Sequence, residues 1–129
     1  MNLSLGQYAL LGAAAVVLGL VAISRLRGVG PARAAELAGQ AGTFVLDVRT
    51  PGEYAGGHLE RAVLIPVQQL SNRLLELPAD KKTPILVYCA VGGRSAAAAG
   101  LLKAKGYESV HDLSGGIRAW QSAGLPVVK

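Results

Sequence analysis

The sequence predicts one α/β domain with a mostly parallel central sheet, preceded by a single N-terminal transmembrane helix. Two observations favour this fold class. Short apolar runs that suit buried strands alternate with helix-like segments over residues 32–129, which is typical of a parallel sheet covered by helices on both faces. The first charged side chain is Arg25, so an uncharged head precedes an ordinary domain. We therefore divide the chain into an anchor at residues 1–24, a linker at 25–31 and a domain at 32–129.

The uncharged head runs from Leu3 to Ile23 and has the length of a membrane span. At about 1.5 Å per residue, residues 3–23 would cross about 30 Å of lipid as a helix. Arg25, Arg27 and Arg33 follow the head, and the positive-inside rule then leaves the domain in the cytoplasm and the N-terminus outside. These features predict a single-pass protein of the inner (cytoplasmic) membrane.

The head has two alternative interpretations. A cleaved signal peptide normally carries positive charge before its apolar run, and residues 1–7 have no charged side chain. A buried soluble helix would need a polar face, and residues 8–23 offer none. Ala15 and Gly19 have the small-xxx-small spacing that lets membrane helices approach closely. This spacing suggests a weak homodimer or a membrane-protein partner, although it also arises by chance in an Ala/Gly-rich span.

Composition narrows the classes of function. Hydrophobic residues make up 51% of the chain and charged residues 16%, which excludes a disordered polyelectrolyte. The net charge of +5 is mild and scattered, so no nucleic-acid partner is expected. The single cysteine, Cys89, excludes an intrachain disulfide and fits a reducing compartment.

The first half of the domain is expected to form a helix, two strands and a second helix. Pro31 suits the first turn of a helix. Residues 43–48 lack the alternation of a half-exposed strand and predict a strand buried on both faces, as do residues 62–65. A second helical repeat ends before Pro78. The inward positions of the two helices are Ala34, Leu37, Ala38 and Ala41, and Val67, Leu70, Leu74 and Leu77.

The second half continues the alternation. Residues 84–89 predict a third buried strand, and residues 95–105 predict an Ala-rich helix that is capped by Gly106. Residues 110–113 predict a short strand, and residues 117–123 a closing helix with Trp120 as a core anchor. The Ala-rich helix is expected to direct four side chains inward: Ala97, Ala98, Leu101 and Leu102.

The third predicted strand delivers Cys89 to the carboxyl edge of the sheet, where ligands bind in open α/β folds. Gly92 and Gly93 follow and allow the loop to curl with its N–H groups inward. The start of the next helix adds unpaired N–H groups and a partial positive charge. A thiol in such a cradle should ionise readily, and the same donors could hold an anion attached to it. The structural alternative is a buried cysteine that ends a core strand.

Three ordered motifs resemble the rhodanese family. The loop at residues 89–95 resembles its active-site pattern C-x-x-G-x-R-S: Cys89, Ala90, Val91, Gly92, Gly93, Arg94 and Ser95. An upstream run resembles L-D-V-R-x-x-x-E-Y-x-x-G-H-I followed by I-P: Leu46–Arg49, Glu53-Tyr54, Gly57–Leu59 and Ile65-Pro66. A closing motif matches at Gly106-Tyr107, Leu113, Gly115–Ile117, Ala119-Trp120 and Gly124–Val127.

The resemblance covers residues 32–128 and implies a single three-layer rhodanese-like domain. Arg61 stands where the family commonly has Gly, and Leu64 where it often has Asn. Both departures lie outside the loop, so they bear on a surface turn more than on the chemistry.

The resemblance implies a sulfurtransferase with Cys89 as the catalytic nucleophile and residues 90–95 as the loop that binds its persulfide or an anion. The implied partners are a small sulfur donor, such as thiosulfate or a persulfide, and a thiol or cyanide-like acceptor. Related dual-specificity phosphatases use Cys-x5-Arg, whereas four residues separate Cys89 from Arg94 here, so the shorter ring favours a sulfur atom over phosphate. No cofactor is expected. A rhodanese-like adaptor at a membrane complex, without relevant catalysis, is the alternative function.

Four residues outside the loop are expected to support it. Asp47 and Arg49 follow a neighbouring strand and could buttress the loop or pair with Glu53, while Arg94 is expected to tie the loop to the body. His58 is expected to be a hydrogen-bonded structural residue, not a catalyst. No His/Cys/Asp/Glu cluster has metal-ligand spacing, so no metal site is predicted.

Overall fold

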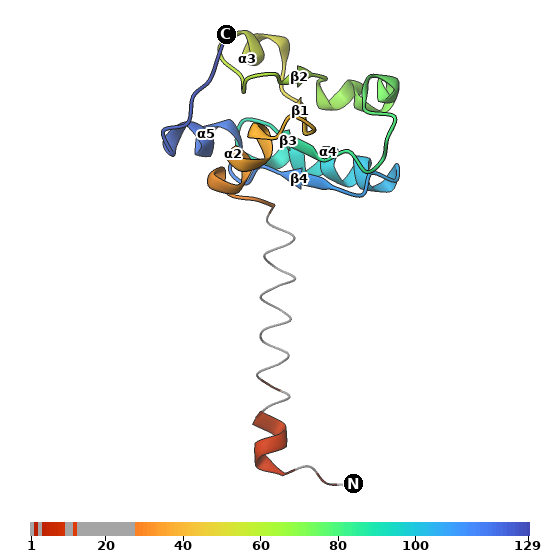
Figure 1. Ribbon diagram of the computed structural model, residues 1–129, viewed down its shortest axis with the longest axis vertical. Helices are drawn as coiled ribbons and strands as arrows, with labels where there is room; N and C mark the ends of the chain where they lie inside the picture. The colour runs from red at the N-terminus through yellow and green to blue at the C-terminus, as the bar shows by residue number, and fades with distance from the viewer. Residues whose placement is uncertain (1, 3, 10–11, 13–27) are drawn as a thin grey trace.

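The computed structural model describes residue 2, residues 4–9, residue 12 and residues 28–129. The predicted anchor and the Ala15–Gly19 pair fall largely on positions outside these ranges (Figure 1). Within the ranges described, no helix is both long and apolar enough to cross a membrane. The anchor, the orientation and the inner-membrane location therefore stay predictions.

Four parallel strands form the sheet in the order β2-β1-β3-β4 (Figure 1). Asp47 at the end of β1 pairs in register with Tyr88 at the end of β3, so both strands finish at the same edge. The predicted parallel α/β sheet is confirmed. The strands are β1 (Phe44–Asp47), β2 (Val63–Leu64), β3 (Ile85–Tyr88) and β4 (Val110–Asp112).

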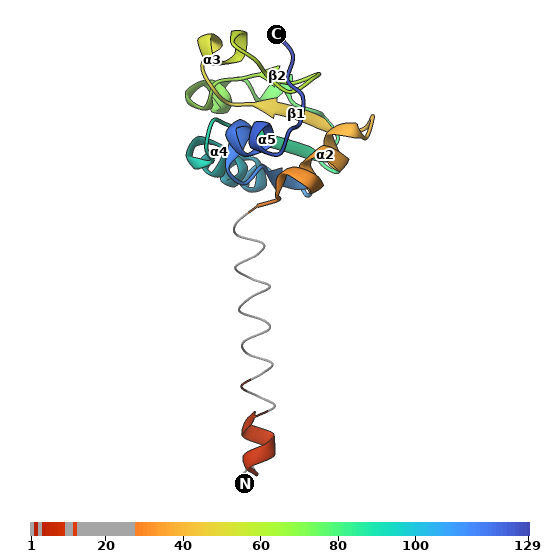
Figure 2. The same ribbon diagram turned by 90° about the vertical axis from the view of Figure 1, so that its left-hand side faces the viewer.

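Helices cover both faces of the sheet (Figures 1 and 2). On one face, α2 (Pro31–Gly39) and α5 (Gly116–Ser122) pack over Leu86 of β3. On the other face, α4 (Gly93–Ala104) and the 3₁₀ helices η1 (Val67–Asn72) and η2 (Leu74–Glu76) pack over Val87. Successive β3 residues therefore enter opposite cores, as the uninterrupted apolar run predicts, and each fully buried aliphatic side chain contributes about 1.5–3 kcal/mol.

The segment predicted as one α-helix over residues 67–77 is instead two 3₁₀ helices, and that prediction is wrong. The bonds run from residue i+3 to residue i: Gln69 N–H donates to Pro66 O, and Leu77 N–H donates to Leu74 O. The two pieces meet at Arg73, whose φ of −126° is not helical. Ser71 and Asn72 lie just before this break, and such side chains favour turns over helix interiors.

Two further expectations need correction. Strand β2 has only two residues, and Val63 is exposed, because β2 lies at the edge of the sheet and is not buried on both faces. Along α4, Ala97 is exposed and Ala99 is buried. The position of Ser95 next to the Cys89 loop decides which side of α4 faces the core. The buried residues of α4 follow from it at helical spacing: Ser95, Ala98, Ala99 and Leu102.

Glycine ends α4 as expected. Gly106 has a φ of +94°, and two bonds close the helix, from Gly106 N–H to Lys103 O and from Tyr107 N–H to Leu102 O. Trp120 is buried, as predicted, and its indole N–H donates to Pro126 O at 2.9 Å. This bond ties the C-terminal segment to α5.

Arg61 occupies the turn where the family resemblance expects glycine. Among the described residues it is the one non-glycine with positive φ, at 65°. A side chain in this region costs about 1–2 kcal/mol. The Arg61 guanidinium donates to Ala38 O at the end of α2, a contact that glycine could not make.

Candidate active site

Cys89 lies directly after β3, the strand between β1 and β4, and α4 begins four residues later. The connection turns sharply at Gly92, whose φ of +122° suits glycine. The turn brings Gly92 N–H to 3.0 Å from Cys89 Sγ. The loop that the sequence predicts as the site is therefore wrapped around the sulfur atom.

Several donors converge on the sulfur. Ser95 Oγ lies 3.4 Å from Cys89 Sγ and 3.2 Å from Gly92 O, so its hydroxyl can turn toward a thiolate. Burial raises the pKa of the Cys89 thiol, but hydrogen bonds from Ser95, from Gly92 N–H and from Val91 N–H outweigh burial, and the pKa lies below its ordinary value. Cys89 itself is only 1% exposed and lies among the buried core residues on the α4 side of the sheet.

The carbonyl groups of the loop point the other way, into α5. Ile117 N–H donates to Cys89 O at 2.9 Å, and Arg118 N–H donates to Ala90 O at 3.2 Å. Gly116 lies at this contact with a φ of +61°, and a Cβ there would come within 2.4 Å of both carbonyl oxygens. The sequence resemblance includes Gly116 but does not show why it must be glycine.

Arg94 ties the loop to the body of the domain, as predicted. Its guanidinium makes a bidentate pair with Glu53, with N···O distances of 2.7 and 2.9 Å. Glu53 is held at the start of α3 (Pro51–Ala55) by a capping box with Thr50. The hydrogen bonds from Arg94 lower the pKa of Glu53 to about 2.

This pair predicts a loss of stability in acid. The pKa of Glu53 in the folded chain is lowered, so the ion pair stabilises the fold fully when the pH is above 4.5, the ordinary pKa of the group. This contribution to the free energy of unfolding is lost as the pH falls through about 2. Both side chains are 34% exposed, so solvent screening limits the contribution to about 1 kcal/mol. We expect Glu53→Gln to lower the free energy of unfolding at pH 6 by about this amount, and the difference from wild type to shrink as the pH falls below 4.5.

Urea unfolding from pH 6 downward would measure this difference. Glu108→Gln is the matched control, because Glu108 is exposed and its side chain forms no ion pair in the described part of the chain. A difference that persists unchanged in acid would contradict an ionised Glu53 in the pair.

Asp47 and Arg49 pair with each other, so the expected alternative, a pair with Glu53, is wrong. Arg49 Nε donates to Asp47 Oδ1 at 3.0 Å, and Arg49 Nη2 donates at 2.7 Å to Asp47 Oδ2 and at 2.7 Å to Gly57 O. Tyr88 OH donates to Asp47 Oδ2 at 2.6 Å and accepts Leu59 N–H at 3.1 Å. This network is buried and supports the sheet edge below the loop.

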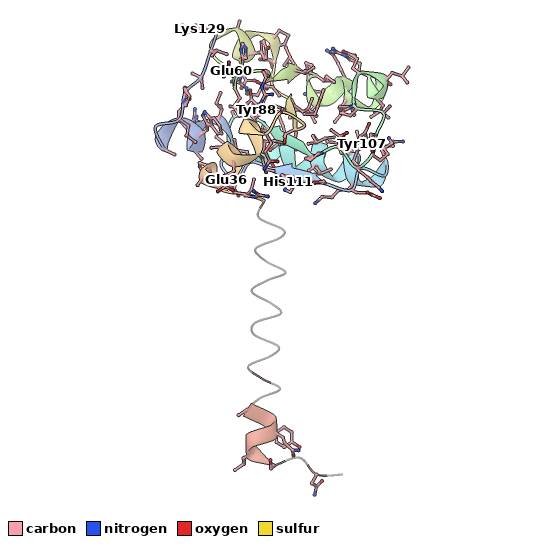
Figure 3. The ribbon with its side chains drawn as sticks, in the orientation of Figure 1. Glu36, Glu60, Tyr88, Tyr107, His111 and Lys129 are labelled. Carbon is pink, nitrogen blue, oxygen red and sulfur yellow. The ribbon has the colours of Figure 1, made fainter. Side chains whose placement is uncertain are left out.

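Tyr88 is a supporting residue that sequence reasoning missed, and Figure 3 shows it in the interior of the domain. Burial and the Asp47 carboxylate raise the pKa of its hydroxyl far above the ordinary value. Tyr88 therefore stays a neutral donor. Its position next to Cys89 is the one sequence signal that could have indicated it.

His58 has the structural role that was expected. Its Nδ1 lies 3.0 Å from Tyr54 O, and its ring stacks on the Tyr54 ring with centroids 3.7 Å apart. His111, which follows Val110 in β4, is half-buried beside Ser109, and burial together with Arg33 and Lys103 lowers its pKa. Neither histidine contacts the Cys89 loop.

Asp112, which the sequence did not single out, lies at the carboxyl end of β4. Burial raises the pKa of its carboxyl, and the neighbouring Ser95 and Lys103 lower it by less. Within the described part of the chain, Asp112 Oδ1 is buried without a hydrogen-bond partner. A cavity of about 740 Å³ extends from Asp112 along α4 to Lys103, and a second of about 450 Å³ lies beside Trp120. Residues 89–95 line neither cavity.

Comparison with known proteins places residues 31–123 in the rhodanese-like domain family. A sulfurtransferase from Allochromatium vinosum is 39% identical over 85 residues, which cover 66% of this chain and 78% of that protein. The thiosulfate sulfurtransferase GlpE of Pseudomonas entomophila is 31% identical over 100 residues, 78% of this chain and 89% of its own. The crystal structure of a rhodanese-related protein from Thermoplasma volcanium is similar with a TM-score of 0.71 at 35% identity, covering 79% of this chain and 97% of that one.

Proposed function

The chain belongs to the rhodanese-like domain family, and we propose that it is a membrane-anchored sulfurtransferase that works through a Cys89 persulfide. The observation that carries the proposal is the loop folded around the sulfur: Gly92 N–H donates to Cys89 Sγ at 3.0 Å, and Ser95 Oγ lies 3.4 Å from Sγ, where its hydroxyl would donate to a thiolate. These donors favour a thiolate, which is the nucleophilic form of cysteine. Relatives that are named sulfurtransferases support the same reaction class.

The reaction consists of two displacements at sulfur. The Cys89 thiolate attacks the outer sulfur of thiosulfate or a persulfide, a new S–S bond forms, and the donor S–S bond breaks. The leaving group, sulfite or a thiolate, takes the bonding electron pair. A thiolate or cyanide acceptor then attacks the outer sulfur of the Cys89 persulfide, and Cys89 leaves as a thiolate. No proton is removed at the attack, so a dedicated histidine base is unnecessary.

The loop stabilises the persulfide in the same way as the thiolate. The N–H groups of residues 90–95 surround a terminal sulfur better than a tetrahedral phosphate because the ring is short. The Arg94–Glu53 pair holds the start of α4 against α3, which keeps these donors in place. This fixed geometry favours sulfur transfer over phosphatase chemistry.

Mass spectrometry of the chain after exposure to thiosulfate or polysulfide tests the covalent step. We expect the mass on Cys89 to rise by about 32 Da, one sulfur atom. Thiosulfate:cyanide turnover should fall to background in Cys89→Ser and should remain in Lys105→Gln, an exposed change beyond the far end of α4. Absence of the adduct with every sulfane donor would contradict the proposed sulfurtransferase activity and favour the adaptor function.

The anchor is part of this proposal. The apolar length of residues 3–23 and the arginines that follow support a single span with the domain in the cytoplasm. In intact cells, a cysteine introduced by Asn2→Cys should react with a membrane-impermeant label, while Cys89 should not. The reverse pattern of labelling would overturn the orientation, and crosslinking of the anchored form would identify a membrane partner or a homodimer.

A further inference from the structure

Two arginines of the candidate site, Arg94 and Arg49, already have carboxylate partners. Arg94 is paired with both oxygens of Glu53, and Arg49 is paired with both oxygens of Asp47 in the buried network. Each pair has no net charge. An anionic sulfur donor that approaches the loop therefore finds no uncompensated positive charge on either side chain.

Arg118 is placed differently. It lies in the first turn of α5, and its own N–H donates to Ala90 O in the loop at 3.2 Å. Because the Cα–Cβ bond of a helical residue tilts toward the helix N-terminus, the Arg118 side chain leaves its backbone on the side of the loop. Arg118 is exposed and, in the part of the chain that the structure describes, forms no ion pair.

The loop surface beside Arg118 carries no charge of its own. Ala90 and Val91 are uncharged, and Val91 is 59% exposed. The acidic groups near the loop are Glu53, which pairs with Arg94, Asp47, which is buried with Arg49, and Asp112, which is half-buried beside Ser95. Among the described residues of the loop and α5, the basic side chain that forms no ion pair is therefore Arg118.

We propose that Arg118 binds the anionic substituent of the sulfur donor and so determines which donors the loop accepts. The inference rests on the proposed sulfur transfer and names the substrate class as small anionic sulfane donors. Their shared chemistry is a sulfane sulfur next to an anion, either the sulfonate of thiosulfate or the carboxylate of a low-molecular-weight persulfide. Arg118 takes part in no bond change. It holds the anion while Cys89 attacks the outer sulfur, and the same anion departs with the leaving group.

Steady-state kinetics of the full chain with three donors would test Arg118. The donors are thiosulfate, a carboxylate-bearing persulfide and an alkyl persulfide that carries no carboxylate. For Arg118→Gln we expect KM for the anionic donors to rise about twofold to fivefold, with kcat unchanged, as for loss of one exposed charge contact. KM for the alkyl persulfide without a carboxylate should not change. Added salt should raise KM for the anionic donors in the wild-type chain and should have little effect on KM in Arg118→Gln.

Two control variants separate binding from folding. Lys105→Gln removes the same charge at the far end of α4 and should leave all three KM values unchanged. Arg118→Lys should restore most of the affinity for anionic donors. An effect on thiosulfate alone, or on the carboxylate persulfide alone, would support the site and identify the anion. Equal KM values in wild type and Arg118→Gln, with turnover intact, would overturn the inference, and absence of turnover in wild type with every donor would overturn the proposed function itself.

Discussion

Gly116→Ala is expected to destabilise the domain by about 3 kcal/mol and to abolish sulfur transfer. The left-handed backbone, at a φ of +61°, costs a side chain about 1–2 kcal/mol. The added Cβ would also lie 2.4 Å from the carbonyl oxygens of Cys89 and Ala90, and moving a packed segment costs about 1–3 kcal/mol more. These carbonyls belong to the loop, so the displacement would also turn its N–H groups away from the sulfur.

Urea unfolding and turnover together would measure this effect. Gly124→Ala is the matched control, because Gly124 has a similar φ of +78° but nothing within 4 Å of the added Cβ. It should cost only about 1–2 kcal/mol and leave turnover intact. Equal losses of stability in the two variants would show that the packing of α5 on the loop is not the constraint.

Replacing Arg49 with methionine is expected to cost about 3–5 kcal/mol, because it leaves the Asp47 carboxylate buried without its cation. Arg49 and Asp47 are both buried, and Arg49 also donates to Gly57 O. The substitution therefore removes charge compensation and a tie to the segment after α3. Tyr88→Phe, which removes one hydrogen bond to a charged oxygen, should cost less, about 1.5–3 kcal/mol.

The matched comparison is Arg33→Met. Arg33 pairs with Glu36 on the surface of α2, where the side chains are 52% and 66% exposed, so its loss should cost no more than about 1 kcal/mol. Urea unfolding at neutral pH would rank the three variants. A cost for Arg49→Met no larger than that for Arg33→Met would contradict the buried network as a support of the fold.

Much of the fold follows from local patterns. The uninterrupted apolar run of β3 indicates burial on both faces, and Pro31 and Gly106 mark helix ends through their own backbone preferences. The phase of α4 and the edge position of β2 are different, because they depend on which segments meet in space. The 3₁₀ geometry of residues 67–76 likewise depends on a break at Arg73 that the apolar spacing does not show.

The candidate active site also contains some features that depend on local sequence and others that depend on contacts between distant segments. Cys89 and the Gly92 turn are predictable because the whole loop lies within a few residues of sequence. Glu53 is 41 residues from its partner Arg94, and Tyr88 is 41 residues from Asp47, so these pairs appear only in the folded chain. Two consecutive glycines, Gly115 and Gly116, indicate a turn with positive φ, but the contact of Gly116 with the Cys89 loop is seen only in the folded structure.

The ionisation of Cys89 tests the central claim most directly, namely that the loop holds this sulfur as a thiolate. Because Cys89 is the only cysteine, the ultraviolet absorbance of the thiolate, followed across pH, reports its pKa without interference from another thiol. We expect a value clearly below the roughly 8.5 of a free cysteine and a rise toward that value in Ser95→Ala, which removes the hydroxyl 3.4 Å from Sγ. A pKa at or above about 8.5 in wild type, unchanged by Ser95→Ala, would contradict the account.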